Sequence, residues 1–306
     1  GDWAAAGLLT EIKPSDKIKT AVEDFTWQAV TIDGKLYGYP VAIEAVGLIY
    51  NKDLVPNPPK TFEEIPELDK QLQEKSGGKV RAILWDYNNT YFTWPLMAAG
   101  GGYVFKYANG AYDIKDTGVA TDGAKKGVQT VVDLINKGIM PKGADYGVMD
   151  AAFNKGEIAM MINGPWAWSN IKKSNINFGV TYIPSVAGSA AKPFVGVMAG
   201  AINAASPNKD LAVEFLENYV LSIDGLKTIN DDVPLGAVAH KEFMKQLASD
   251  PNIAATFANA QAGEPMPNVA AMGKFWSAMA TSLSNVTSGR QPVDKALDAA
   301  AKRIVK

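Results

Sequence analysis

The sequence contains no cysteine and a single histidine, His240. Without cysteine the chain can form no disulfide bond, no thiolate metal site, no iron–sulfur cluster and no cysteine nucleophile. A Ser-His-Asp triad would have to use His240, and metal motifs built on two histidines are excluded. Because His240 stands beside Lys241, we expect it to be a surface side chain rather than a catalyst. The composition therefore predicts neither a metal site nor a cofactor.

Long apolar runs and an excess of one charge are also absent. No run approaches the roughly 18 apolar residues that a membrane-spanning helix needs. The 30 Lys and Arg residues nearly balance the 32 Asp and Glu residues, so nothing indicates a nucleic-acid partner or an anionic membrane surface. The first residue is Gly1, and no basic segment followed by an apolar one comes after it. We therefore expect no signal peptide, although a processed chain would look the same.

Strand-like and helix-like segments alternate through the 306 residues, which predicts an α/β fold with a prior of about two domains. Asp33-Gly34 and Asn109-Gly110 each predict a β-hairpin, because both central residues of the tight turn need a positive φ. Thr61-Phe62-Glu63-Glu64 is a capping box and predicts a helix that reaches about Lys75. Thr121 predicts the N-cap of another helix.

A further helix is predicted to begin at Ser206-Pro207, since serine is a good N-cap and proline fits the first helical turn. Its apolar residues Leu211, Phe215, Leu216 and Tyr219 follow a helical spacing. We expect them to form a buried stripe.

Glu44 is the most unusual residue of the apolar run from Val41 to Tyr50. A carboxylate within a buried strand needs either a partner or a functional reason. One interpretation is a structural glutamate held in an ion pair. The other is an acceptor for the hydroxyl groups of a ligand, and the sequence leaves both open.

Aromatic residues gather in three segments that follow predicted strands or lie on a late helix: Trp85, Tyr87, Tyr91, Phe92 and Trp94, then Trp166 and Trp168, then Phe275 and Trp276. Most single tryptophans are core residues. Ligand sites of α/β proteins, however, lie beyond the carboxyl ends of strands. An indole or phenol ring offers a flat apolar face to the apolar faces of a pyranose. These segments therefore favour a site for a neutral sugar.

Seven collinear segments resemble the maltose/maltodextrin-binding proteins of bacterial ABC importers. They are Pro40-Val41-Ala42-Ile43-Glu44-Ala45, Tyr50-Asn51-Lys52-Asp53-Leu54, Asn57-Pro58-Pro59-Lys60-Thr61, Tyr91-Phe92-Thr93-Trp94-Pro95, Ala152-Phe153-Asn154-Lys155-Gly156, Asn163-Gly164-Pro165-Trp166-Ala167-Trp168 and Pro234-Leu235-Gly236-Ala237-Val238. The similarity runs essentially from Gly1 to Lys306, with one short insertion near Lys75 to Lys79. Collinear matches in this number are far more specific than any single motif.

The resemblance implies an α/β fold of the two-lobed periplasmic-binding-protein type (type II), in which each lobe is a mostly parallel sheet flanked by helices. The sugar would lie in the cleft between the lobes, which close by a hinge motion. Residues 1–42 and 200–245 would form a truncated N-lobe, residues 47–194 and 252–306 the C-lobe, and residues 43–46, 195–199 and 246–251 the hinge or crossover segments.

The same resemblance implies eight sugar-binding side chains and one missing contact. Tyr91, Trp166 and Trp276 would stack on sugar rings, Glu44 would accept hydrogen bonds from hydroxyl groups, and Tyr146 would donate through its phenol. Phe92 and Met266 would line the apolar wall, and Asn89 would accept where the family has an acidic residue. Ala280 stands where the family has an arginine, so we expect altered affinity for the same class of sugar.

The implied function is non-enzymatic binding of maltose and maltodextrins in the periplasm, for delivery to the membrane subunits of an ABC transporter. Two alternatives remain open. A glycoside hydrolase could act on α-glucans through Glu44 and a second carboxylate. A structural or scaffold role would be marked by the absence of any sugar binding.

Gly1 aligns with a point well inside the family's chain, so roughly 60–70 residues would be missing if a βαβ unit takes about 30. The missing part would carry strands of the N-lobe and several side chains that grip the sugar. Removing strands from a sheet leaves unpaired backbone groups and an uncovered apolar face. We therefore expect the N-lobe to be remodelled, swapped with a neighbour, or completed by another copy or piece. We also expect sugar affinity to fall tenfold or more.

Overall fold

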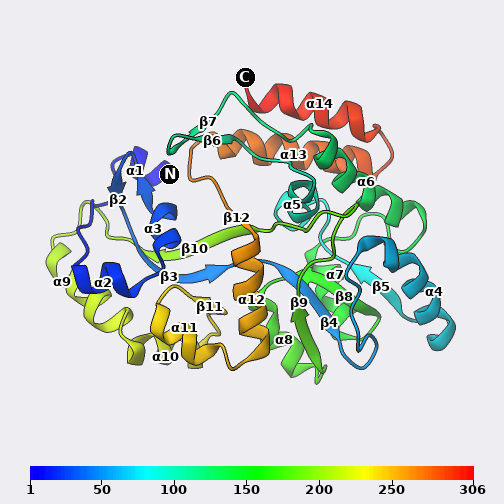
Figure 1. The fold of residues 1–306 in the computed structure, drawn as a ribbon, viewed down its shortest axis with the longest axis horizontal. Coiled ribbons are helices and arrows are strands. Elements are labelled where there is room, and N and C mark those ends of the chain that lie inside the picture. The colour runs from blue at the N-terminus through cyan, green and yellow to red at the C-terminus, as the bar shows by residue number, and fades with distance from the viewer.

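A computed structural model describes residues 1–306 as two bodies built on two four-stranded sheets (Figure 1). The first sheet has the order β11-β3-β10-β12, made of Ala237–Val238, Tyr39–Glu44, Phe194–Gly200 and Glu264–Pro265. The second has the order β5-β8-β4-β9, made of Arg81–Leu84, Ile158–Asn163, Gly47–Asn51 and Phe178–Thr181. The predicted α/β class is confirmed.

Helices and one small hairpin complete each body. The first body contains α1 (Asp2–Ala5), α2 (Asp16–Ala21), α3 (Asp24–Ala29), the hairpin β1–β2 (Thr31–Ile32 and Lys35–Leu36), α9 (Lys209–Phe215), η3 (Leu216–Val220), α10 (Ile223–Asp232) and α11 (Lys241–Leu247). The second contains η1 (Phe62–Glu64), α4 (Ile65–Ser76), α5 (Thr90–Ala99), the hairpin β6–β7 (Lys106–Ala108 and Ala111–Asp113), α6 (Asp122–Asn136), α7 (Tyr146–Asn154), η2 (Pro165–Ala167), α8 (Trp168–Lys173), α13 (Met272–Thr287) and α14 (Val293–Ile304).

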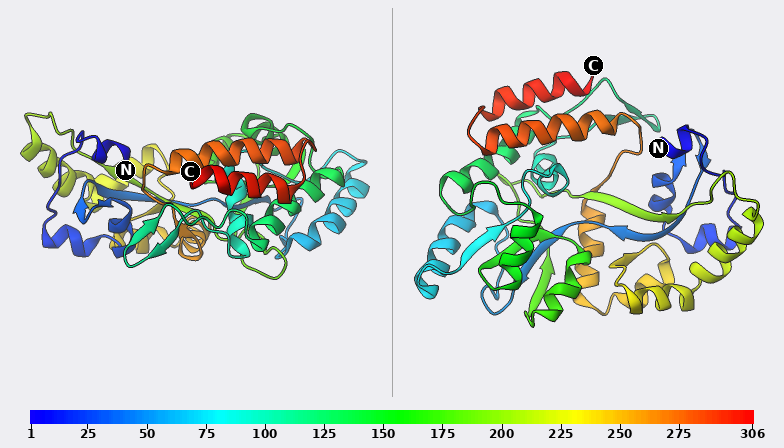
Figure 2. Two further views of the ribbon diagram at one scale, coloured as in Figure 1. Left: turned by 90° about the horizontal axis from the view of Figure 1, so that it is seen from above. Right: turned by 180° about the vertical axis from the view of Figure 1, so that it is seen from behind.

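Three segments join the bodies. Only Ala45 and Val46 separate β3 of the first sheet from β4 of the second. Strand β10 brings the chain back from the second body to the first, and α12 (Pro251–Ala262) contacts strands of both sheets. Figure 2 shows from above and from behind that the two bodies lie side by side with these segments between them.

The expectation that each sheet is mostly parallel is wrong, because both sheets are mixed. Only β10–β12 and β5–β8 are parallel pairs. The pairs β3–β10, β3–β11, β4–β8 and β4–β9 are antiparallel. For β3 and β10 the reason is that both strands cross between the bodies. The chain leaves the first body along β3 and returns to it along β10, so the two strands run in opposite directions and pair antiparallel.

The local turn and cap predictions are confirmed. Asp33 and Gly34 have φ of 50° and 76°, and Asn109 and Gly110 have φ of 52° and 80°. Both hairpins therefore form at the residues whose conformation the tight turn requires. The capping box of Thr61 and Glu64 is present in both directions, and the Thr121 hydroxyl accepts from the amide of Ala124 at 3.3 Å.

The prediction for the helix after Ser206 is wrong in two respects. Helix α9 begins at Lys209, after Asn208. Its stripe is not buried, because Leu211, Phe215 and Tyr219 are 67%, 57% and 62% exposed. The predicted helical spacing is nevertheless correct, because the rings of Phe215 and Tyr219, four residues apart, stack with their centroids at 6.4 Å on one face. What the chain does not supply is an element that covers this face.

Strand β10 also has an open edge. Residues 196–200 pair with β3 on one side. On the other side β12 reaches only Phe194 and Val195. Met198, in the middle of the unpaired stretch, is 43% exposed. The first body thus has the open strand edge and the uncovered apolar face that the sequence analysis expects.

The second body protects its own edge strand. The carboxylate of Asp69 on α4 is buried, forms two hydrogen bonds with the Arg81 guanidinium, and accepts from the amide of Ala82 at 2.8 Å. Because β5 is the last strand of its sheet, this bond satisfies a backbone amide that has no neighbouring strand. Helix α4 therefore closes the edge, as stable sheets commonly require.

Candidate functional site: an aromatic cluster where the two sheets meet

Four of the predicted sugar-binding rings lie in mutual contact. The ring centroids of Tyr91 and Phe92 are 5.4 Å apart, and Trp166 lies 6.3 Å from Tyr91 and 6.4 Å from Phe92. Tyr146 adds a fourth ring at 6.1 Å from Phe92. We call these four residues the aromatic cluster. They come from α5, α7 and η2 of the second body.

The start of α5 fixes Tyr91 and Phe92. The side-chain oxygen of Asn89 accepts from the Tyr91 amide at 3.1 Å and caps the helix. The Thr93 hydroxyl donates to the carbonyl of Tyr87 at 2.7 Å and accepts from the Trp85 indole at 3.1 Å. The turn that precedes α5 is therefore held from both sides. The oxygen of Asn89 thus already accepts one hydrogen bond, in the cap, and keeps a second lone pair.

Trp166 owes its position to a glycine. The indole folds back over Gly164, where a Cβ atom would collide with the ring. Trp166 nevertheless stays 42% exposed, so one part of the indole faces solvent. Tyr146 is the first residue of α7, and its phenol oxygen accepts from the side-chain amide of Asn163 at 3.3 Å.

Phe194 connects the cluster to Trp276. Its ring lies 6.3 Å from Tyr91 and 5.6 Å from Trp276, and it stacks on Trp94 at 5.0 Å. Phe194 is not among the predicted site residues. The feature that could have indicated it is its position, because it is the first residue of β10, the strand that crosses between the bodies. Met266 is held near this crossing by its amide, which donates to the carbonyl of Val195 at 3.1 Å.

Glu44 lies at the end of β3, beside Tyr91. Burial raises the pKa of Tyr91 well above its ordinary value, and the nearby charge of Glu44 raises it further. Glu44 takes part in none of the ion pairs of the structure. The interpretation of Glu44 as an ion-paired structural residue is therefore wrong, and its carboxylate is available as an acceptor at the edge of the aromatic cluster.

Another carboxyl group, Asp86, lies on the turn that leads into α5. Burial raises its pKa, the charge of Asp145 raises it further, and hydrogen bonds from Asn89 partly oppose the rise. Asp145 itself caps α7 by accepting from the Val148 amide at 2.9 Å. The carboxyl charge that acts on Asp86 is therefore that of Asp145, and not that of Glu44.

The other aromatic residues of the three segments are core. Trp85, Tyr87, Trp94 and Trp168 are at most 3% exposed. The Tyr87 hydroxyl donates to the carbonyl of Pro141 at 2.7 Å, which uses its polar end inside the fold. His240 is also structural, since its Nδ1 accepts from the Phe243 amide at 3.2 Å and caps α11.

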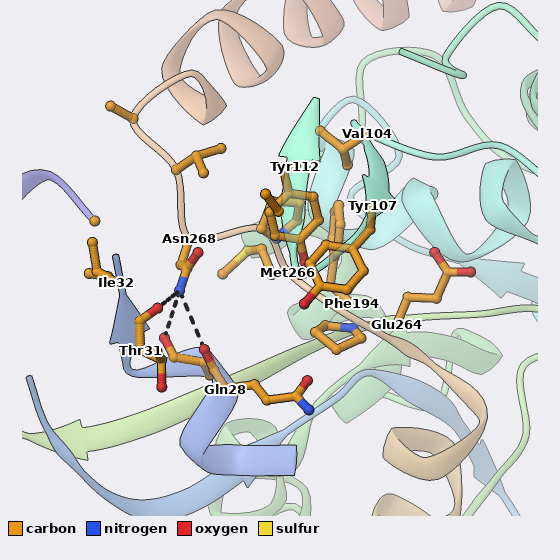
Figure 3. Close-up of a pocket in the computed structure, with 18 of the residues that line it drawn as sticks. Gln28, Thr31, Ile32, Val104, Tyr107, Tyr112, Phe194, Glu264, Met266 and Asn268 are labelled. Atoms are coloured by element: carbon orange, nitrogen blue, oxygen red, sulfur yellow. Dashed lines mark hydrogen bonds between the residues drawn. The ribbon is translucent and has the colours of Figure 1, made fainter. Parts of the chain in front are cut away.

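A large cavity lies next to the cluster but is not centred on it. It has a volume of about 910 Å³ and shares Met266 and the Phe194 ring with the region described above (Figure 3). No group of three or more His, Asp or Glu side chains is placed to hold a metal ion. None of the helices combines the length and apolar character needed to cross a bilayer.

Comparison with known proteins gives the family. Residues 1–225 match the family of bacterial extracellular solute-binding proteins. The galactooligosaccharide-binding protein of Bacillus subtilis (strain 168) is 30% identical over 318 residues, covering 99% of this chain and 73% of the relative. A maltooligosaccharide ABC transporter solute-binding lipoprotein of Streptococcus pneumoniae (strain ATCC BAA-255 / R6) is 30% identical, with the same coverage.

A third relative, the maltodextrin-binding protein MdxE of Bacillus subtilis (strain 168), is 29% identical over 301 residues, covering 95% of this chain and 71% of the relative. These matches span nearly all of the chain, and the resemblance inferred from the seven sequence segments is confirmed. The two-sheet fold and the whole-chain matches lead to one assignment: this chain belongs to the bacterial extracellular solute-binding proteins.

Proposed function

We propose that the aromatic cluster binds maltose and maltodextrins without changing them chemically. The observation that carries this proposal is the convergence of the cluster rings with the unpaired carboxylate of Glu44. Rings stack on the apolar faces of glucose units, while a carboxylate accepts from the hydroxyl groups. Relatives named for maltooligosaccharides and maltodextrin support this choice of sugar.

The two bodies would act as lobes that close on the sugar. In this proposal the N-lobe comprises residues 1–42 and 200–245, the C-lobe residues 47–194 and 252–306, and the hinge residues 43–46, 195–199 and 246–251. A sugar that touches both lobes only when they are shut favours the closed form. The closed form would deliver the sugar to the membrane subunits of an ABC importer, on the outer side of the cytoplasmic membrane, in the periplasm.

The affinity would be low because the contacts are one-sided. Tyr91, Phe92, Tyr146, Trp166 and Trp276 all belong to elements of the second body, and Glu44 alone comes from a strand of the first sheet. Each contact of about 1.4 kcal/mol that the other lobe does not make lowers affinity tenfold. We expect maltotriose to bind this chain at least tenfold more weakly than it binds a full-length relative.

Calorimetry with maltose and maltotriose tests the site. Trp166→Ala removes a half-exposed ring of the cluster, and we expect affinity to fall by about tenfold or more, as for other aromatic anchors. Trp3→Ala is the matched control, because Trp3 is 68% exposed and lies in α1. Equal effects of the two substitutions, or binding of both sugars unchanged by Trp166→Ala, would overturn the assignment.

The hydrolase alternative makes a different prediction. Glycoside hydrolysis needs two carboxyl groups that flank the scissile bond. The charge of Asp145 acts on Asp86, and Glu44 is not among the groups that shift the pKa of Asp86. We therefore expect that prolonged incubation with maltotetraose yields no shorter glucans by chromatography. Protein-dependent shortening that Glu44→Gln abolishes would establish the hydrolase instead.

We further propose that the uncovered face of the first body associates with a second copy of the chain. The open edge of β10 offers unpaired backbone groups, and Leu211, Phe215 and Tyr219 offer exposed apolar surface on a neighbouring helical segment. The two features are contiguous, since the position of Gly200 on β10 lies against the Leu216 side chain. Exposed edges and apolar patches of this kind promote pairing between chains.

A further inference from the structure

Three separate segments supply most of the lining of the cavity of about 910 Å³. The hairpin β6–β7 of the second body forms one wall, and residues 28–34 of the first body form another. The third wall is the stretch that leads from β12 to α13. Asn268 holds this stretch in place, since its side-chain amide donates to the carbonyls of Gln28, Ala29 and Thr31 (Figure 3).

Aromatic rings form one side of this cavity. Tyr107 and Tyr112 lie across the hairpin with centroids 4.8 Å apart and planes at 55°, so that they make a corner. Tyr107 is 58% exposed, which leaves its ring open to the cavity and to solvent. Trp94 and Phe194, stacked at 5.0 Å and buried, also line the cavity. Figure 3 shows Tyr107, Tyr112, Phe194 and Met266 gathered on this side, facing Asn268 and Thr31.

The charged side chains of the lining have one sign. Asp33 and Glu264 line the cavity, no lysine, arginine or histidine does, and the one positive group of the lining is the amino group of Gly1. Glu264 lies near enough to Tyr112 that its charge, after burial and the neighbouring Tyr107, helps to raise the pKa of Tyr112. Lys192 approaches Glu264 at 3.5 Å from outside the lining, and both side chains remain about two-fifths exposed. Such an exposed pair is weak, so Glu264 can still attract a second cation.

We propose that this cavity binds a small organic cation, namely a substituted ammonium group with a compact apolar body. The face of a tyrosine ring attracts an ammonium group within about 6 Å of its centroid, and the attraction grows when water is excluded. Carboxylates at Asp33 and Glu264 favour the same charge, and an anion would be repelled by both. The volume lies within the usual range for small-molecule sites. This site adjoins the proposed sugar site at Met266 and Phe194, but the proposal does not rest on sugar binding.

Choline and its uncharged isostere 3,3-dimethylbutan-1-ol are the probes, titrated into the 306-residue chain by calorimetry. The two molecules share a shape and differ in charge. We expect choline to bind about tenfold or more tightly than the alcohol, because the ring faces and carboxylates act on the charge. Tyr107→Phe keeps the ring and should keep the affinity, whereas Tyr107→Leu should weaken choline binding about tenfold.

Tyr182→Leu is the matched control, because Tyr182 is 57% exposed and does not line the cavity. Glu264→Gln should weaken choline binding and leave binding of the alcohol unchanged. The proposal is overturned if choline and the alcohol bind equally, if no saturable choline binding is found, or if Tyr107→Leu acts no more strongly than Tyr182→Leu. Competition between maltotriose and choline would also overturn it, by assigning the cavity to the sugar.

Discussion

The two sheets differ in how completely the chain covers them. In the second body, β4 is central, pairs with β8 on one side and β9 on the other, and the edge strand β5 is closed by Asp69. In the first body, β10 pairs fully on one side only, and the helix beside it leaves Phe215 and Tyr219 exposed. The same kinds of strand and helix thus give a closed body in one place and an open one in the other. Regular secondary structure does not by itself ensure that a fold is covered.

The largest contrast should appear on truncation of phenylalanines from the two bodies. Phe275 is fully buried in the second body, where Trp94, Phe194 and Trp276 surround it. We expect Phe275→Ala to lower the free energy of unfolding by about 3–5 kcal/mol. Phe215→Ala removes a ring that is 57% exposed. It should change the free energy of unfolding by only about 0.5 kcal/mol. Urea unfolding of both variants measures the difference, and equal losses would show that the face around Phe215 is covered in solution.

A second contrast concerns the edges of the two sheets. Asp69→Asn leaves the Arg81 guanidinium without its charged partner, and we expect a loss of about 2–3 kcal/mol. The matched control is Asp231→Asn, whose ion pair with Lys227 is exposed on both sides and should contribute about 0.5 kcal/mol or less. If Asp69→Asn cost no more than the control, the closure of the β5 edge by α4 would not matter to stability.

The open face of the first body can be tested through self-association. A second copy that covers Phe215 would bury an apolar ring, and Phe215→Lys would place a charge in that contact. We expect the substitution to weaken the dimer by about tenfold or more. Light scattering over a concentration series gives the dissociation constant, with Leu8→Lys, at a residue also exposed in the first body, as the control. A monodisperse monomer at all concentrations would remove the self-association proposal.

The smallest effect is expected at the cap of the second body's first long helix. Hydrogen bonds from the Thr61 backbone and hydroxyl lower the pKa of Glu64 below its usual 4.5. A lowered folded-state pKa stabilises the protein above the unfolded value, and this stabilisation is lost as the pH falls through the folded value. Glu64→Gln should therefore cost about 0.5–1 kcal/mol near pH 7 and less near pH 3. A cost that did not shrink in acid would mean that the charge of Glu64 is not what stabilises the cap.

Local features were predictable because neighbouring residues determine them. The positive φ of Asp33-Gly34, the capping box at Thr61 and the cap at Thr121 depend on residues within four positions of each other. The buried stripe of α9 was mispredicted because burial depends on what packs against a helix, and the spacing of Leu211 and Phe215 carries no information about that. The mostly parallel sheets were mispredicted for a related reason: strand direction is decided where the chain crosses between bodies.

The sugar-site residues illustrate the same division. Their aromatic type and their places after strands could be read from the sequence, and so could the anomaly of Glu44. The role of Phe194, which joins Tyr91 to Trp276, could not, since those three residues are far apart along the chain. The resemblance to a known family was needed to select Trp166 and Tyr91 from a group of aromatic residues that also contained the core residues Trp85 and Trp94.

The sequence by itself determined the turns, the caps, the α/β class and the family, because these follow from short-range backbone preferences and from many collinear matches. The tertiary structure decided which rings meet, which strand edge stays open and which carboxylate has no partner. Those outcomes depend on contacts between residues distant in sequence, and such contacts form only when β3, β10 and α12 bring the two bodies together.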